Sequence, residues 1–204
     1  MAAEHETFWT WFSDHEDELH SFDCHDESAR EKIFDQLASA MQSVHPNLTF
    51  EFGPNETKRE FVISAAGIRS AFSAVIDLVK AAPPLDRWQI IPFRPRRSPV
   101  STVQINDKWV DPKNVEFTLL DNGVNAGIYL FLPGFKNDDS DLRQIGYLLL
   151  DEALGEYDVE TKLGLIKILA PETSAQGNRY PLSQLPASFD RLVARLEGRT
   201  QKPF

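Results

Sequence analysis

The chain has 204 residues, of which 42% are hydrophobic and 25% charged, and its formal net charge is −10. This composition is ordinary for a globular protein with a substantial core. It excludes a disulfide-built secreted scaffold, because Cys24 is the one cysteine, and a membrane-spanning protein, because no apolar run approaches ~20 residues. The N-terminal residues lack the pattern of a signal peptide, so we expect a cytoplasmic protein with no membrane partner.

The first part of the chain predicts two acidic N-terminal helices over 5–45. Apolar side chains recur at steps of three and four from Phe8 to Phe22, and again from Ile33 to Val44. Ser28, with a glutamate three residues later, has the spacing of a capping box for the second helix. That helix is expected to end before Pro46.

A strand–strand–helix–strand unit is predicted over 48–93. Polar and apolar side chains alternate at 48–52, and an apolar run resumes after a turn at Gly53-Pro54-Asn55. An apolar helix follows and is expected to stop at the proline pair Pro83-Pro84. The four elements are expected at 48–52, 60–64, between Gly67 and Pro83, and at 87–93.

The same order of elements recurs over 115–169, after a basic loop and a packed connector at 100–112. Asp138 to Asp141 supply candidate N-caps for its helix, which is expected to close near Gly155. The segment 172–186 is expected to be a loop. The remaining elements are expected at 115–119, 127–132 and 163–169, with a short C-terminal helix at 186–196.

These elements predict an α+β fold. Each unit has one apolar helix and one half-buried sheet face, and neither can bury itself alone. We therefore expect the two units to form a mainly antiparallel sheet with helices packed on one side, preceded by the two N-terminal helices, in a single domain over 1–204. The alternative is two domains with a boundary near 97–100.

The net charge is concentrated at the N-terminal end. Residues 1–60 contain 14 Asp and Glu but 4 Lys and Arg, whereas residues 61–204 contain 17 of each kind. Nucleic-acid binders need an excess of basic residues, so no nucleic-acid partner is expected. An acidic face suits either simple solvation or a basic protein partner.

Short catalytic and metal-binding signatures are absent from the sequence, so neither cofactor nor metal is predicted. His15, His20, Cys24 and His25 carry ligand-type atoms, with Asp23 and Asp26 nearby. However, the first two histidines are five residues apart and point ~140° apart on a helix. Cys24 is not expected to be a nucleophile, because the neighbouring carboxylates oppose formation of its thiolate.

The loop Arg94-Pro95-Arg96-Arg97 is the main candidate for an anion-binding or partner-binding site. Arginine suits phosphates, carboxylates or an acidic protein face, and Trp88 is expected to flank the site. The alternative is internal: the acidic N-terminal helices supply the countercharge and dock against this loop.

Three carboxylates, Asp151, Glu152 and Glu156, gather where the helix of the second unit ends. Paired carboxylates perform acid–base chemistry when burial separates their pKa values. At a helix terminus we expect them to be solvated, so no catalytic residue is assigned.

Four stretches resemble a group of uncharacterised bacterial proteins over roughly the first half of the chain. They are Phe8-Trp9-Thr10-Trp11-Phe12, the strand segments 48–53 and 60–67, and the segment 88–95. The resemblance implies a bacterial cytosolic origin and transfers neither an activity nor catalytic residues.

Two hypotheses about function follow, and metal binding at the N-terminal histidines is a third, weaker reading that elemental analysis would decide. The first is a non-catalytic binding or protein-interaction module with an acidic N-terminal face. The second is an enzyme, a hydrolase or a transferase, acting on an anionic substrate near Arg94, Arg96 and Arg97. The sequence sets no oligomeric state and leaves both hypotheses open.

Overall fold

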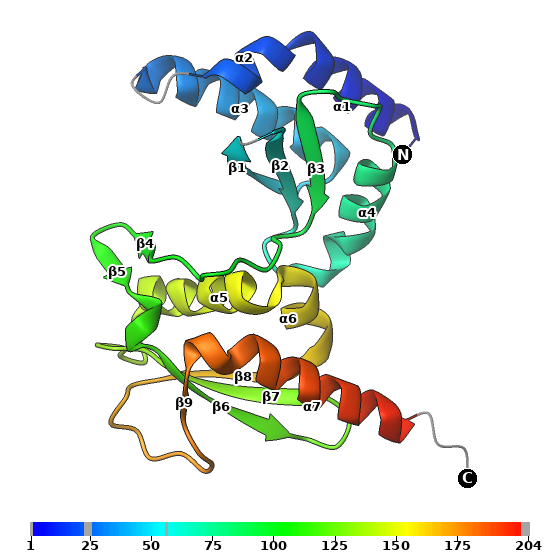
Figure 1. The fold of residues 1–204 in the computed structure, drawn as a ribbon. Coiled ribbons are helices and arrows are strands. Elements are labelled where there is room, and N and C mark those ends of the chain that lie inside the picture. The colour runs from blue at the N-terminus through cyan, green and yellow to red at the C-terminus, as the bar shows by residue number, and fades with distance from the viewer. Residues whose placement is uncertain (1, 23–25, 56, 201–204) are drawn as a thin grey trace. The chain divides into compact units, whose positions relative to one another are not determined.

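The computed structural model describes residues 2–22, 26–55 and 57–200 and has the α+β class that the sequence predicts (Figure 1). The chain divides into two compact units, Met1–Arg94 and Pro95–Phe204, which we call the N-unit and the C-unit. Each unit has a hydrophobic core of its own. A single domain over 1–204 stays a prediction. Within the described ranges, no helix combines the length and apolar character needed to cross a membrane.

The N-unit begins with α1 (Ala2–Asp14), α2 (Glu16–Ser21) and α3 (Glu27–Val44). The first predicted helix is divided into two, because His15 leaves helical geometry with φ −109° and ψ 13°. The predicted capping role of Ser28 is wrong. The carboxylate of Asp26 accepts a hydrogen bond of 3.0 Å from the backbone N–H of Ala29 and therefore caps α3 two residues earlier.

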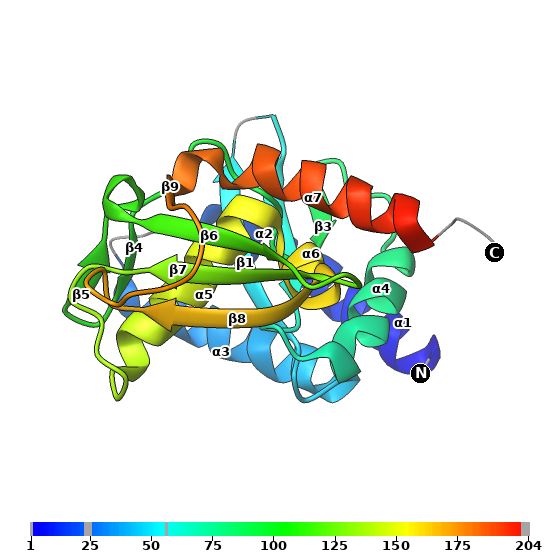
Figure 2. The same ribbon diagram turned by 90° about the horizontal axis from the view of Figure 1, so that it is seen from below.

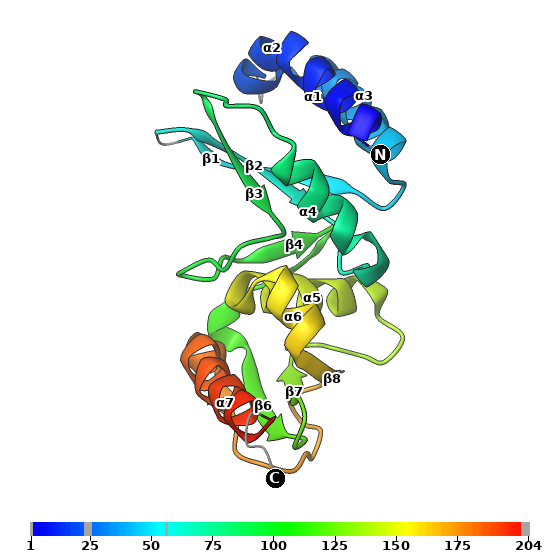
Figure 3. The same cartoon turned by 90° about the vertical axis from the view of Figure 1, so that its right-hand side faces the viewer.

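The sheet of the N-unit has the strand order β1-β2-β3. The first two strands pair antiparallel, and β3 pairs parallel to β2 through the crossover helix α4, which lies alongside both strands (Figure 3). The predicted turn at 53–55 belongs instead to the first strand, where the register shifts as in a β-bulge. The elements are β1 (Thr49–Asn55), β2 (Arg59–Ser64), η1 (Arg69–Ala71), α4 (Phe72–Lys80) and β3 (Trp88–Pro92).

Aromatic side chains fill the core of the N-unit. Phe12 of α1 is fully buried, and its ring centroid lies 4.9 Å from that of Phe61 and 5.2 Å from that of Trp88. Phe50 and Phe52 of β1 belong to the same cluster. Because these strand residues alternate along the chain, they share one face of the sheet, and α1 and α3 cover it.

The C-unit repeats this connectivity. β6 and β7 pair antiparallel, α5 and α6 form the crossover, and β8 pairs parallel to β7, so the strand–strand–helix–strand order is confirmed in both units. The elements are β4 (Val103–Ile105), β5 (Lys108–Val110), η2 (Pro112–Asn114), β6 (Glu116–Asp121), β7 (Ala126–Phe131), α5 (Ser140–Leu154), α6 (Glu156–Lys162), β8 (Leu163–Leu169), β9 (Tyr180–Pro181), η3 (Leu182–Gln184) and α7 (Leu185–Thr200).

The C-unit sheet has the order β8-β7-β6-β9, and α5 and α7 pack against it (Figure 2). The structure differs from the expected shared sheet in one respect: each unit keeps its own. The reason is that the crossover helix brings the third strand back to the free edge of the second strand of the same unit. The two strands pair parallel there, so the sheet is completed within one unit. The segment at 100–112, expected to be a packed connector, contains the hairpin β4–β5.

The ends of α5 follow the local signals in the sequence. The carboxylate of Asp139 accepts a hydrogen bond of 3.0 Å from the N–H of Leu142, which confirms an N-cap in the predicted acidic run. Gly155 ends the helix with φ +83°, a conformation that favours glycine. The same glycine starts α6, a helix that was not predicted from the sequence.

Candidate functional site

The polar face of α1 carries the most distinctive surface of the N-unit. Phe8, Trp9 and Phe12 point into the core and are at most 3% exposed. Glu6, Thr10, Ser13 and Asp14 of the same helix are exposed and polar, as expected for an amphipathic helix. Of these, Glu6 and Asp14 are carboxylates.

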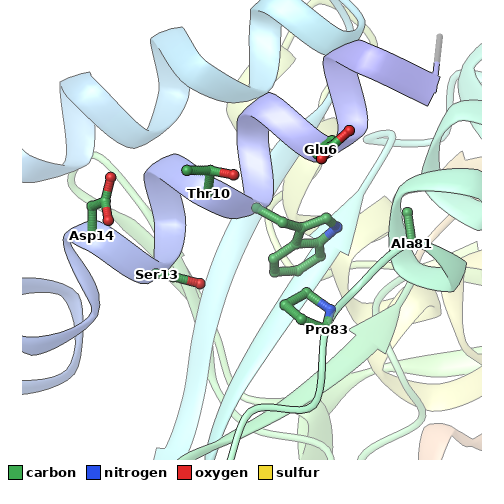
Figure 4. A pocket seen from close by; sticks show the side chains of 7 residues that line it. Glu6, Thr10, Ser13, Asp14, Ala81 and Pro83 are labelled. Carbon is green, nitrogen blue, oxygen red and sulfur yellow. The ribbon is translucent and has the colours of Figure 1, made fainter.

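One pocket of about 420 Å³ lies between α1 and the chain that follows α4. Figure 4 shows Glu6 and Asp14 at the two ends of the row contributed by α1, with Thr10 and Ser13 between them. Facing this row is a wall of small and proline side chains after α4. We call this site the Trp9 pocket; its lining residues are Glu6, Trp9, Thr10, Ser13, Asp14, Ala81 and Pro83.

The indole of Trp9 is held in place by the core. Its Nε1–H donates a hydrogen bond of 2.9 Å to the carbonyl oxygen of Leu78 in α4. Its ring makes edge contacts with Phe8 and Phe12 at centroid distances of 4.9 Å and 5.4 Å. Trp9 therefore supports the pocket rigidly, although only 3% of its surface is exposed, and on the opposite side Pro83 contributes no N–H donor.

Two further hollows, of about 330 Å³ and 450 Å³, lie between α1 and α3 and share Trp11, Ala40 and Ser43. The first also contains Glu4, and the second contains Asp35 and His15. The ring of His15 stacks on that of Trp11 at 4.4 Å. In addition, its Nδ1–H donates a hydrogen bond of 2.8 Å to the carbonyl oxygen of Trp11. These two contacts hold the imidazole against the indole. We call these hollows the Trp11 grooves.

Negative charge dominates this surface. Residues 2–44 contain eleven Asp and Glu residues but only two basic ones, Arg30 and Lys32. None of the residues that line the Trp9 pocket or the Trp11 grooves is a lysine or an arginine. Glu6, Asp14 and Asp35 are exposed and form no ion pair within the part of the chain that the structure describes.

The predicted site residues are divided between the two units. Arg94 belongs to the N-unit, where its Nε forms an ion pair of 2.5 Å with Glu51 of β1. Trp88 also belongs to the N-unit and is a core residue, 2% exposed. Arg96 and Arg97 belong to the C-unit, where the backbone N–H of Arg97 donates to the carbonyl oxygen of Glu152 at 2.7 Å.

Arg96 is held by several contacts within the C-unit. Its guanidinium pairs with Asp158 at 2.6 Å and Asp190 at 2.9 Å, and its Nε donates to the carbonyl oxygen of Leu154 at 2.6 Å. Partial burial opposes its charge, but the hydrogen bonds to these two carboxylates outweigh burial and raise its pKa. Glu51 pairs with Arg94, and Asp158 and Asp190 pair with Arg96; these three acids lie outside the acidic N-terminal helices.

His20 packs against Trp88, with a centroid distance of 5.4 Å. Burial lowers the pKa of this imidazole, and the charges of Arg87 and Arg59 lower it further. Arg59 stacks on the ring of Phe22 at 4.0 Å and donates to the carbonyl oxygen of His20 at 2.6 Å. Both His15 and His20 therefore pack against other residues of the N-unit.

Cys24, His25 and Asp23 lie outside the described residues. Within the described ranges, no group of three or more His, Cys, Asp and Glu side chains is arranged to hold a metal ion.

The carboxylates at the end of α5 are less solvated than predicted. Asp151 is 7% exposed and Glu156 is fully buried, because Gly155 turns the chain directly from α5 into α6. Glu152 accepts a hydrogen bond of 2.7 Å from the N–H of Ser101. The expectation that all three are solvated is therefore wrong.

The Trp9 pocket was not predicted from the sequence. One side of the pocket has a local sequence pattern, because Glu6, Thr10, Ser13 and Asp14 repeat at helical spacing on one face of α1. The opposite side has no such pattern, because Pro83 lies beyond α4 in the chain and only the packing of α1 on α4 brings it near.

Comparisons of the chain with models of known families, with curated proteins and with solved structures find no match. The resemblance to uncharacterised bacterial proteins therefore stays a prediction.

Proposed function

We propose that the chain is a non-catalytic binding module whose α1–α3 surface receives a basic segment of a partner protein. One observation carries the proposal: the Trp9 pocket places a tryptophan beside two carboxylates, each Trp11 groove places one beside a single carboxylate, and no lysine or arginine lines them.

Basic side chains complement this surface in two ways. The ammonium or guanidinium group pairs with the carboxylates, and the apolar stem of lysine or arginine packs along an aromatic wall. A phosphate backbone would be repelled by the same carboxylates, so a basic protein segment is favoured over a nucleic acid.

The charges are exposed, which sets the expected character of binding. Exposed ion pairs contribute about 0–1 kcal/mol each, so affinity depends on several of them acting together. Salt screens such pairs, with a Debye length of about 8 Å at 0.15 M. Binding should therefore weaken steeply as salt rises, and association should be fast at low salt.

The test is a titration of fluorescent peptides with the full chain, followed by fluorescence anisotropy. One peptide contains lysine, alanine and leucine, and a matched peptide contains glutamate in place of lysine. We expect the lysine peptide to bind at low salt and to lose at least about tenfold in affinity at 0.5 M salt, and the glutamate peptide not to bind.

Matched variants locate the surface. Neutralising Glu6, Asp14 and Asp35 together (Glu→Gln, Asp→Asn) should weaken binding of the lysine peptide by about tenfold. The control neutralises three acids of the C-unit, all of which have exposed side chains: Asp107, Asp138 and Glu172. Equal losses in the two triple variants would contradict the proposed surface, and absence of binding at low salt would contradict the proposed function.

A further inference from the structure

We infer that the Trp9 pocket binds preferentially to extended segments in which two basic side chains have a fixed spacing, with an apolar side chain between them. This inference rests on the proposed function and specifies which basic segment the surface prefers.

The two carboxylates of the pocket are too far apart to share one cation. Glu6 and Asp14 are eight residues apart in one continuous helix, α1. An α-helix rises 1.5 Å per residue, so their backbone positions lie ~12 Å apart along the axis. Their side chains lie at the two ends of the row in Figure 4, with Thr10 and Ser13 between them, so a single ammonium group does not reach both within the separation of about 4 Å that an ion pair requires. The pocket therefore suits two separate cationic groups.

The middle of the pocket is mainly apolar. Trp9 forms one wall, and Ala81 and Pro83 face it. The hydroxyls of Thr10 and Ser13 line the edge between the carboxylates. The middle of the pocket therefore suits an apolar side chain of the ligand. The hydroxyls at its edge suit hydrogen-bonding groups on either side of that side chain.

The wall that faces Trp9 contains the C-terminal end of α4. α4 ends at Lys80, with Ala81 as its C-cap, so the carbonyl end of a nine-residue helix lies at this wall. A helix C-terminus carries partial negative charge and favours cations. Pro83 has no backbone N–H, so it offers no donor that would attract an anionic ligand. Lys80 supplies a positive charge at the same helix end, so the preference for a cationic ligand rests on Glu6 and Asp14.

An extended ligand matches the separation of the carboxylates. In an extended segment, alternate side chains point to the same side and the chain rises about 3.3 Å per residue. Two basic residues four positions apart then lie ~13 Å apart, close to the separation of the two carboxylates, and the residue midway points toward Trp9. A helix spans this distance only with eight residues, and its diameter of ~10 Å is wide for a pocket of about 420 Å³. The preferred pattern is basic–x–apolar–x–basic.

The experiment compares three peptides of one composition, identically flanked and labelled: Lys-Ala-Leu-Ala-Lys, Ala-Lys-Leu-Lys-Ala and Lys-Lys-Leu-Ala-Ala. Each is titrated with the full chain at low salt and measured by fluorescence anisotropy. We expect the first peptide to bind about fivefold more tightly than the other two, the effect of two well-placed exposed ion pairs.

Two double variants identify the carboxylates that read the spacing. Glu6→Gln with Asp14→Asn should remove the preference among the three peptides. Glu31→Gln with Asp35→Asn changes the same residue types at exposed positions of α3, outside the Trp9 pocket, and should lower all affinities equally while keeping the preference. Circular dichroism and thermal melting confirm that both variants are folded.

The outcomes separate this inference from the proposed function. Equal binding of the three peptides, or a preference that survives Glu6→Gln with Asp14→Asn, overturns the spacing inference while the acidic surface still binds basic segments. Failure of all three peptides to bind at low salt overturns both.

Discussion

The indole N–H of Trp9 donates a 2.9 Å hydrogen bond to the carbonyl oxygen of Leu78, and this bond ties α1 to α4 across 69 positions of the chain. It does two things at once. It gives a buried polar group its partner, and it fixes one wall of the Trp9 pocket.

Trp9→Phe should therefore destabilise the protein. Phenylalanine keeps the aromatic packing but leaves the carbonyl oxygen of Leu78 without its donor, which costs about 1–2 kcal/mol of unfolding free energy. Urea denaturation measures the change. The control is Trp109→Phe, since that indole is 63% exposed and its replacement should cost within about 0.5 kcal/mol. Equal stability of the two variants would show that the hydrogen bond contributes nothing.

Arg96→Ala tests whether the basic loop is a structural tie or an anion site. This guanidinium joins the loop to Leu154, Asp158 and Asp190, so its loss should destabilise the C-unit by about 1–2 kcal/mol. The control, Arg191→Ala, removes an exposed arginine whose guanidinium donates a hydrogen bond to the hydroxyl of Ser188. Thermal melting with and without inorganic phosphate decides between the roles. Phosphate stabilisation of the wild type that disappears in Arg96→Ala would favour the anion site.

His20 should make the stability of the N-unit depend on pH. Burial, then Arg87 and Arg59, lower its pKa in the folded protein, so below the ordinary histidine pKa of 6.5 the unfolded chain binds the proton more readily. Stability is therefore fully present above pH 6.5 and decreases as the pH falls below it. Melting temperatures of the wild type and His20→Gln between pH 8 and pH 5 measure this.

The wild type should lose more stability than His20→Gln over that range. Parallel curves would contradict the role of His20. The carboxylates of Asp121 and Asp139 do not contribute to the pH dependence of stability between pH 8 and pH 5. Backbone hydrogen bonds and basic neighbours lower their pKa values, so their contributions are lost only at more acidic pH.

Two helical glycines should respond in opposite ways to alanine. A Cβ at Gly146 of α5 would lie 2.6 Å from Ile168 Cδ1 and 3.0 Å from Leu132 Cδ1, so Gly146→Ala should cost about 1–3 kcal/mol through overpacking. Gly198 of α7 has nothing within 4 Å of such a Cβ, so Gly198→Ala should stabilise by about 0.5–1 kcal/mol. Chemical denaturation of both variants checks the pair. A neutral Gly146→Ala would mean that α5 does not approach the sheet this closely.

Sequence and structure agree best where the information is local. The spacing of apolar residues predicts the strand–strand–helix–strand order of both units, because side chains three or four apart share a helix face and alternate residues share a strand face. Asp139 and Gly155 mark the two ends of α5, since capping depends on a few neighbouring backbone groups. At the start of α3, by contrast, the capping-box spacing at Ser28 predicted the wrong residue, because Asp26 is the cap.

The sequence by itself determined the α+β class, the repeated order of elements and the concentration of acidic residues before the first strand. Only the tertiary structure decided which residues meet: Trp9 with Leu78, Arg96 with Asp190, and α1 with the chain around Pro83. The physical reason is that secondary structure follows from short-range periodicity. Pockets, ion pairs and burial depend instead on contacts between segments tens of residues apart, and no local pattern in the chain specifies those contacts.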